Sequence, residues 1–96
     1  MAEVILNELE KRYEITTDGI LAKLEYILSM DKIFLTHTEV PQSLGGRGIG
    51  SKLVKYALED IKGKGLTLVP LCPFVAQYIK NHPEYKELVF KGIKIK

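Results

Sequence analysis

VPQSLGGRGIGSKLVK, residues 40–55, holds the most informative pattern of this chain. An alternating apolar and polar run ends at Val40, four glycines then fall within six residues, and a run with the apolar spacing of a helix follows. Glycine allows positive φ angles and close approach of the backbone, and the start of a helix offers unpaired N–H groups and a positive dipole end. The order strand, glycine loop, helix therefore predicts an anion site, most often one for phosphate.

Two common nucleotide-binding loops do not fit these glycines. A P-loop has lysine and then serine or threonine after its last glycine, whereas Gly50 is followed by Ser51 and then Lys52. A dinucleotide-binding loop has the spacing G-x-G-x-x-G, whereas the spacing here is G-x-G-x-G. A glycine-rich turn that serves only packing is the structural alternative. It explains one or two glycines better than four glycines with Arg47, Ser51 and Lys52 among them.

The composition is that of a small globular domain. We expect one domain over residues 1–96, which at this size buries roughly 60% of the surface of the unfolded chain. Apolar residues make up 46% of the chain, and no apolar run reaches the ~18–20 residues of a membrane-spanning helix, so we expect a cytoplasmic location and no membrane partner. The single cysteine excludes an internal disulfide and a cysteine-cluster metal site, and we expect no metal. A net charge of +2 is too small to favour nucleic acid.

Before the glycine loop, alternation predicts an antiparallel meander. Its strands are residues 12–17, 20–28 and 32–40, joined by a turn at Asp18-Gly19 and a second short turn. Residues 4–6 allow a further short strand. On the third strand, period-two alternation predicts one face with Ile33, Leu35, His37 and Glu39 and another with Phe34, Thr36, Thr38 and Val40.

After the loop, apolar spacing predicts a helix from about Gly48 to Lys62, ended by the glycines at 63 and 65. A short buried strand over 66–70 should lie parallel to 32–40 through a right-handed crossover. A second helix should start at Pro73, with Cys72 as N-cap, and reach about Asn81. A turn or short helix over 85–89 and an edge strand or loose tail over 90–96 complete the chain. The predicted fold is a three-layer α/β or α+β arrangement with a mixed sheet and two main helices.

Several blocks of this sequence resemble a known family. The glycine loop is similar to the pyrophosphate loop of GNAT-superfamily N-acetyltransferases, [RQ]-x-x-G-x-[GA], at Gly48 and Gly50, and departs from it at Gly45, where that loop has Arg or Gln. The blocks LTHTEVP at 35–41, VPLCPFV at 69–75 and HPEY at 82–85 resemble a small GNAT-like family. The resemblance covers about residues 12–89, and these blocks in this order are more specific than the loop alone.

The resemblance implies a shortened GNAT domain that binds acetyl-CoA and acts as an N-acetyltransferase on an amine acceptor that it does not name. It implies that Glu39, Val40 and Pro41 lie beside the arm of the cofactor. The loop residues that it implies for the pyrophosphate are Gly45, Gly46, Arg47, Gly48, Ile49, Gly50, Ser51 and Lys52.

Two other functions stay as alternatives. Full-length GNAT enzymes build the acceptor pocket from additional strands and loops, so the first alternative is a non-catalytic CoA-binding or protein-interaction module. The second is a nucleic-acid binder that uses Lys91, Lys94 and Lys96. Aromatic residues, on which bases stack in such binders, do not alternate with these lysines, which speaks against it.

An amine acceptor must lose a proton before it attacks. A lysine-like amine has a pKa near 10.4, so about one molecule in a thousand is unprotonated at pH 7.4. We therefore expect His37 or Glu39 to act as a base, with Tyr78 as an acid toward the leaving thiolate. Each of these also has a structural interpretation: a buried histidine, a cap or ion-pair partner, and a core tyrosine.

Cys72 has two interpretations. A lone cysteine is usually a small buried hydrophobic residue. An N-cap position, however, lowers the pKa of a thiol, and ligands of α/β folds bind at the carboxyl ends of parallel strands. We expect Cys72 to lie in or beside the active site and to contact the cofactor. Direct attack by the amine and transfer through an acetyl-Cys72 thioester both stay open.

Overall fold

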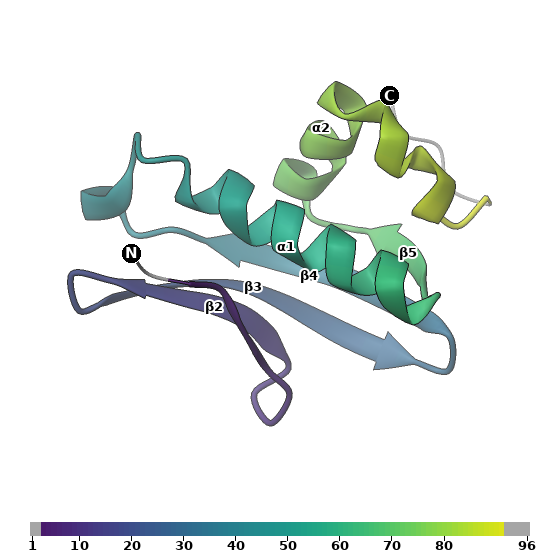
Figure 1. The fold of residues 1–96 in the computed structure, drawn as a ribbon, viewed down its shortest axis with the longest axis horizontal. Helices are drawn as coiled ribbons and strands as arrows, with labels where there is room; N and C mark the ends of the chain where they lie inside the picture. The colour runs from purple at the N-terminus through teal and green to yellow at the C-terminus, as the bar shows by residue number, and fades with distance from the viewer. Residues whose placement is uncertain (1–2, 92–96) are drawn as a thin grey trace.

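The computed structural model describes residues 3–91 of the chain and contains one five-stranded sheet (Figure 1). The strands lie in chain order, and β1 to β4 pair antiparallel, whereas β5 lies parallel to β4. Their bounds are β1 Ile5–Asn7, β2 Arg12–Thr17, β3 Ile20–Ser29, β4 Lys32–Glu39 and β5 Thr67–Pro70. The predicted mixed sheet is confirmed, and the short strand allowed before the meander forms its first edge.

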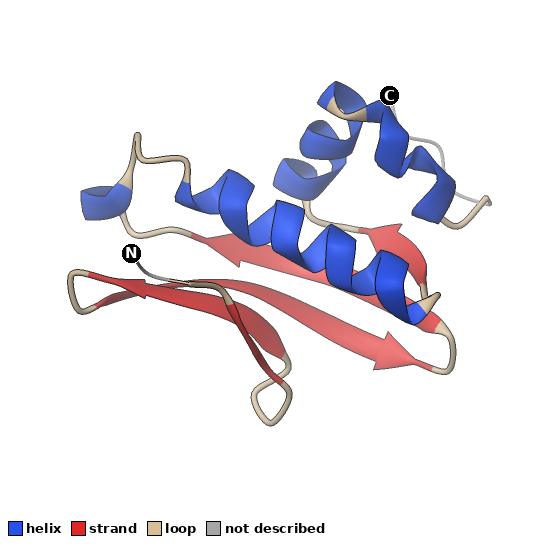
Figure 2. Ribbon diagram, viewed as in Figure 1, coloured by secondary structure: helices blue, strands red, loops and turns tan. Residues whose placement is uncertain are grey.

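Two main helices follow the meander, as the sequence predicts (Figure 2). Helix α1, Ile49–Lys64, connects β4 to β5, and α2, Pro73–Asn81, follows β5 with Pro73 in its first turn. Two 3₁₀ helices, η1 (Gln42–Leu44) and η2 (Pro83–Leu88), flank them. No helix of residues 3–91 is long and apolar enough to cross a membrane.

Helix α1 ends two residues later than predicted. Gly63 lies inside the helix, because a single glycine with ordinary φ weakens a helix without breaking it. The end comes at Gly65, whose φ of 68° is the left-handed conformation that terminates helices. The predicted tail over 90–96 lies largely outside the described residues, although Val89 forms a single parallel bridge to Leu68 of β5.

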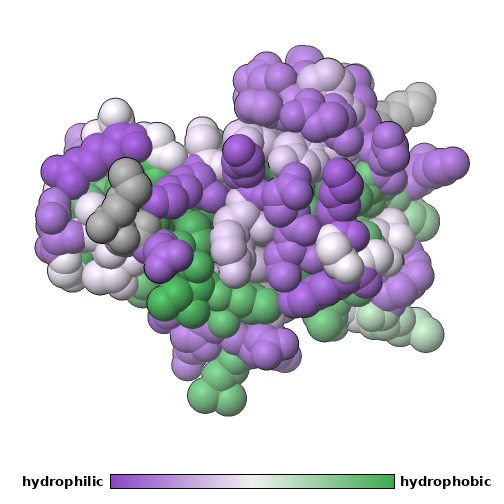
Figure 3. All heavy atoms as spheres, in the orientation of Figure 1, coloured by the Kyte–Doolittle hydropathy of each residue, from purple (hydrophilic) through white to green (hydrophobic). Residues whose placement is uncertain are grey.

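Both main helices pack on the same face of the sheet. One continuous hydrophobic cluster joins residues of α1 and α2 to the inward side chains of β2, β3 and β4. The opposite face is more open: the side chains that β2, β3 and β4 present there are partly exposed, although Val69 of β5 is buried. The surface over the helices is mostly hydrophilic (Figure 3). Both main helices therefore form one layer over the sheet, and the predicted mixed sheet with two main helices is confirmed for the described residues.

The pairing of β3 with β4 contains a bulge. Glu25 pairs with His37, but the next pair joins Tyr26 to Leu35, so Thr36 has no partner of its own in the ladder. Its hydroxyl instead donates to the carbonyl of Glu25 at 3.2 Å. One extra residue moves every later side chain of the strand to the opposite face.

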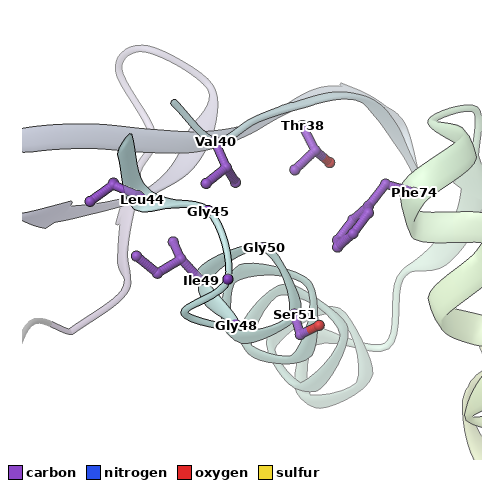
Figure 4. A pocket seen from close by; sticks show the side chains of 10 residues that line it. Thr38, Val40, Leu44, Gly45, Gly48, Ile49, Gly50, Ser51 and Phe74 are labelled. Atoms are coloured by element: carbon purple, nitrogen blue, oxygen red, sulfur yellow. The ribbon is translucent and has the colours of Figure 1, made fainter. Parts of the chain in front are cut away.

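The bulge reverses the predicted faces at the end of β4. Thr38 and Val40 point toward the helices, on the side of the buried Leu35 (Figure 4). His37 and Glu39 lie on the open face, each with a side chain 57% exposed. The prediction that they share a face with Leu35 was therefore wrong, because strict alternation does not reveal an inserted residue.

Candidate functional site

A cavity of about 360 Å³ lies where the start of α1 meets the end of β4 and the first turn of α2 (Figure 4). None of the lining residues that the structure describes is charged, and most belong to the glycine loop. They are Thr38, Val40, Leu44, Gly45, Gly46, Gly48, Ile49, Gly50, Ser51 and Phe74.

The loop needs its glycines for two different reasons. Gly46 and Gly48 have φ angles of 79° and 71°, in the left-handed region that side chains with a Cβ rarely adopt. Gly50 lies in the helix, but a Cβ at this position would come within 2.9 Å of the Phe74 ring. Glycine at 50 therefore allows α2 to approach the first turn of α1 and to close one side of the cavity.

The start of α1 carries backbone donors that the helix itself does not use. Lys52 is the first residue whose amide bonds back, to the carbonyl of Gly48 at 3.0 Å, so the amides of residues 48–51 precede the helical ladder. No side chain of residues 3–91 caps this end, and its first turn carries no acidic residue. These donors and the positive dipole end lie at the cavity, an arrangement suited to an anion such as phosphate.

The two cations expected at the anion site lie elsewhere. Arg47 donates to Asp18 of the β2–β3 turn at 2.8 Å, and both side chains are largely exposed. Lys52 lies beside a different surface hollow, together with Lys55 and Tyr56. Among the polar loop residues predicted to contact phosphate, only Ser51 lines the cavity.

The structure thus divides the predicted cofactor-binding residues into two groups. Those on the cavity wall are Val40, Gly45, Gly46, Gly48, Ile49, Gly50 and Ser51. Those that do not line it are Glu39, Pro41, Arg47, Lys52 and Cys72.

Cys72 lies where β4 and β5 separate. The last paired residues of the two strands are Leu35 and Pro70, and the amides of Leu71 and Cys72 both donate to the carbonyl of Leu35, at 3.1 and 3.0 Å. Cys72 is the N-cap of α2, as predicted, and is 5% exposed. Its sulfur lies 3.3 Å from the hydroxyl oxygen of Thr38 on β4, so this contact bridges the gap between the diverging strands.

The environment of Cys72 lowers the pKa of its thiol. Burial acts most strongly and in the opposite direction, raising the pKa, but hydrogen bonding from Thr38 and the backbone amides of Phe74 and Val75 outweigh it. Hydrogen-bonding groups, with no charged side chain among the main causes, therefore make the thiol easier to ionise than an ordinary cysteine.

The other predicted catalytic residues are not gathered around the cavity. His37 and Glu39 contact each other on the open face, with Nε2 and Oε1 3.6 Å apart. Tyr78 lies half-buried on α2, stacked on His82 at a ring separation of 4.0 Å, and lines a smaller adjoining hollow of about 140 Å³. Burial, then the charges of Glu84 and Glu59, raise the pKa of Tyr78.

Sequence reasoning missed three residues of the cavity wall: Thr38, Leu44 and Phe74. Only Phe74 had a signal, since it lies in the block VPLCPFV, directly after the helix start at Pro73. Thr38 had none, because its face depends on the bulge at Thr36.

Comparison with known proteins points to one family. The profile of the GCN5-related N-acetyl-transferase family matches residues 12–88. Protein NATD1 of Xenopus tropicalis is 37% identical over 66 residues, which are 69% of this chain and 60% of that protein. Protein NATD1 of Homo sapiens is 39% identical over 49 residues, 51% of this chain and 43% of that protein. The chain thus spans between 43% and 60% of the length of these two relatives.

The fold agrees with this comparison. The solution NMR structure of a GCN5-like protein from Staphylococcus aureus matches with a TM-score of 0.71 and 26% sequence identity. The match covers 92% of this chain and 87% of that one. The GNAT-like fold expected from the sequence is therefore confirmed, and the chain belongs to the GCN5-related N-acetyltransferase family.

Proposed function

We propose that this chain binds acetyl-CoA and transfers its acetyl group to an amine acceptor. The observation that carries the proposal is the uncapped start of α1, residues 48–51, which lies at the cavity between β4 and α2. Family membership supports the same reaction class. A cytoplasmic location and a single domain over residues 1–96 stay predictions.

The cavity wall fits two chemically different parts of this ligand. The amides at the start of α1 suit a pyrophosphate, because they supply several donors and the first turn holds no carboxylate that would repel it. Val40, Leu44 and Phe74 add apolar surface, which suits the pantetheine arm. Several such contacts together are enough for micromolar affinity, about 8 kcal/mol.

Acetyl-CoA, when bound, supplies an activated thioester. In the proposed reaction the amine nitrogen forms a bond to the acetyl carbon, the carbon–sulfur bond breaks, and the proton lost by the amine ends on the sulfur of CoA. The chain must position the amine, remove its proton and exclude water. Because only apolar and backbone groups surround most of the cavity, it suits the last task.

The residues that handle the proton remain part of the proposal. His37 and Glu39 serve an acceptor that approaches β4 from the open face, where both are exposed. Cys72 instead serves a route through an acetyl thioester, and the lowering of its thiol pKa supports that route. Tyr78 is the proposed acid. Direct attack and the thioester route are separated by whether acetyl-CoA alone adds one acetyl group to the protein that is absent in Cys72→Ala.

Calorimetric titration tests the ligand. Acetyl-CoA should bind at micromolar concentrations and CoA comparably, with ATP and NAD at least about tenfold weaker, because the loop lacks both common nucleotide patterns. ATP binding as tight as acetyl-CoA would contradict the proposal. Release of free thiol with a lysine-containing peptide or a polyamine then tests transfer. Binding without any thiol release across an amine panel would support the alternative, a non-catalytic CoA-binding module.

A further inference from the structure

We propose that Thr38 is a positioning residue of this site: its hydroxyl holds the Cys72 sulfur behind the cavity wall and sets the pH at which acetyl transfer operates. The inference rests on the proposed function, because it assigns a task within the same reaction. It concerns a residue that the sequence pattern placed on the wrong face of the sheet.

The bulge is the first step of the argument. With regular alternation, Thr38 would face outward with Phe34, and His37 and Glu39 would face the helices. The unpaired Thr36 turns it inward, so that it lines the cavity together with Val40 (Figure 4). Bulges often redirect a side chain next to a functional site, and here the redirected side chain is a hydroxyl on an otherwise mostly apolar and backbone wall.

The contact with sulfur is the second step. The Thr38 hydroxyl oxygen lies 3.3 Å from Cys72 Sγ, across the gap left where β4 and β5 stop pairing. Thr38 therefore connects the cavity, which it lines, to the Cys72 thiol, which does not line it. When the thiol is ionised, the hydroxyl is the donor, because a thiolate can only accept.

The absence of charged partners makes this hydroxyl important. Burial and hydrogen bonds, and no charged side chain of the described residues, set the thiol pKa. The two elements that carry the contact hold five titratable residues besides Cys72. On β4, Lys32 pairs with Asp31 at the start of the strand, and His37 and Glu39 lie on the open face. On α2, Tyr78 lines the adjoining hollow and Lys80 is exposed. The first turn of α1 carries no acidic residue. Thr38 is thus the side chain of the described residues whose hydroxyl contacts this sulfur, and it is the donor when the thiol is ionised.

The reaction step that depends on this contact is balanced as follows. The Cys72 thiol first loses its proton to solvent. Its sulfur then forms a bond to the acetyl carbon while the bond to the sulfur of CoA breaks, and that sulfur takes up a proton. The Thr38 hydroxyl remains bonded to threonine throughout and only orients and stabilises the attacking sulfur.

The test is a titration of the ligand-free protein. Ultraviolet absorbance of the thiolate reports Cys72 alone, because the chain has one cysteine and Cys72→Ala supplies the blank. Wild type should ionise at a lower pH than an ordinary cysteine. Thr38→Val keeps the shape of the side chain and should raise the midpoint by about one pH unit, which reduces the thiolate at pH 7 about tenfold. Thr38→Ser should restore the wild-type midpoint.

Thr36→Val is the matched control, since Thr36 is on the same strand and its hydroxyl contacts a backbone carbonyl instead of sulfur. It should leave the midpoint unchanged. An unshifted midpoint in folded Thr38→Val, or an equal shift in Thr36→Val, would overturn the proposal. The pH–rate profile of acetyl transfer should move with the midpoint in Thr38→Val and return in Thr38→Ser; an unmoved profile would also overturn it. Absence of acetyl-CoA binding to wild type would instead contradict the proposed function. The thiol titration is made without ligand, so the two failures can be told apart.

Discussion

The two ends of α1 are built from glycines with nearly the same backbone conformation but with different surroundings. Gly48 has φ 71° and ψ 18°, and Gly65 has φ 68° and ψ 26°. At the C-terminal end the protein satisfies its own carbonyls: Gly65 donates to Lys62 and Leu66 donates to Ile61, both at 3.2 Å. At the N-terminal end, no side chain of the described chain caps the amides. The same glycine geometry thus accompanies satisfied carbonyls at one end of the helix and amides without a side-chain cap at the other.

Side-chain contacts repeat this difference. Near the C-terminal end, Asp60 accepts from the Tyr13 hydroxyl and from Lys64, each at 2.9 Å, and Glu59 accepts from the Tyr85 hydroxyl at 2.6 Å. Lysines in the last turn complement the negative dipole end. The helix is therefore fixed by its second half, which keeps its first turn in place without a cap.

The largest effect should come from exchanging the two glycines for valine. Both positions have positive φ and open space for a Cβ, so Gly48→Val and Gly65→Val should each cost about 1–2 kcal/mol of stability from backbone strain. Only Gly48 lines the cavity, where the added methyl groups would occupy the place of the phosphate. Calorimetry should therefore show at least a ~100-fold loss of acetyl-CoA affinity in Gly48→Val, about 2.7 kcal/mol, and little change in Gly65→Val.

Circular dichroism must show that both variants fold, and Gly48→Ala with Gly65→Ala provides a milder pair if valine is not tolerated. Equal affinities in the folded pair would mean that the two ends of α1 do not differ in function. That result would remove the main support for a phosphate site.

A charge at each end should give a smaller, opposite pair of effects. Ser51→Glu places a carboxylate in the first turn, where it stabilises the helix dipole by about 0.3–1 kcal/mol but repels an anionic ligand at the cavity. Lys62→Glu places the same charge in the last turn and should destabilise the helix by a similar amount. We expect acetyl-CoA affinity to fall about tenfold in Ser51→Glu and to stay within twofold in Lys62→Glu.

Urea unfolding and calorimetry on the same samples check this pair. The informative result is that stability and affinity change in opposite directions in Ser51→Glu. If affinity rises with stability there, the first turn of α1 does not face the anionic part of the ligand.

The contrast between the ends of α1 also shows where sequence reasoning works. The start at Gly48 was predictable, because local patterns of glycine and apolar spacing determine it. The exact end was less so, because Gly63 and Gly65 are equally good signals until φ is known. Two further features depend on long-range geometry: the ion pair of Arg47 with Asp18, 29 positions apart, and the bulge at Thr36.

The bulge had the larger consequence for the candidate site. It placed Thr38 and Val40, instead of His37 and Glu39, on the helix side of the chain. The strand itself was predicted at 32–40 and observed at Lys32–Glu39, so only its last residue was wrong. The number of residues on two paired strands must differ for a bulge to form, and one strand alone does not contain that information. Predicting the strand therefore did not predict which of its side chains faces the cavity.

The smallest effect should come from removing one of the contacts that fix the second half of α1. Tyr85→Phe loses the hydroxyl that donates to Glu59 but keeps the ring. Because Glu59 is exposed, we expect a loss of only about 1 kcal/mol at pH 7, and acetyl-CoA affinity within twofold of wild type. Tyr56→Phe is the control, since Tyr56 is an exposed tyrosine on α1 that keeps its edge contact with Tyr13.

The pH dependence of this variant sharpens the test. The hydrogen bond to Glu59, followed by burial and the charge of Glu59, raises the pKa of Tyr85 to about 12. A raised pKa means that the folded state holds the proton more tightly than the unfolded state, in which tyrosine ionises near about 10. The contribution of Tyr85 is therefore fully present below pH ~10 and is lost as the pH rises toward 12.

Urea unfolding of wild type and Tyr85→Phe should show a stability difference that is constant from neutral pH to about 9 and shrinks above about 10, with Tyr13 ionising alike in both proteins. A difference that stays constant across this range would mean that the Tyr85 hydroxyl does not anchor the helix through Glu59.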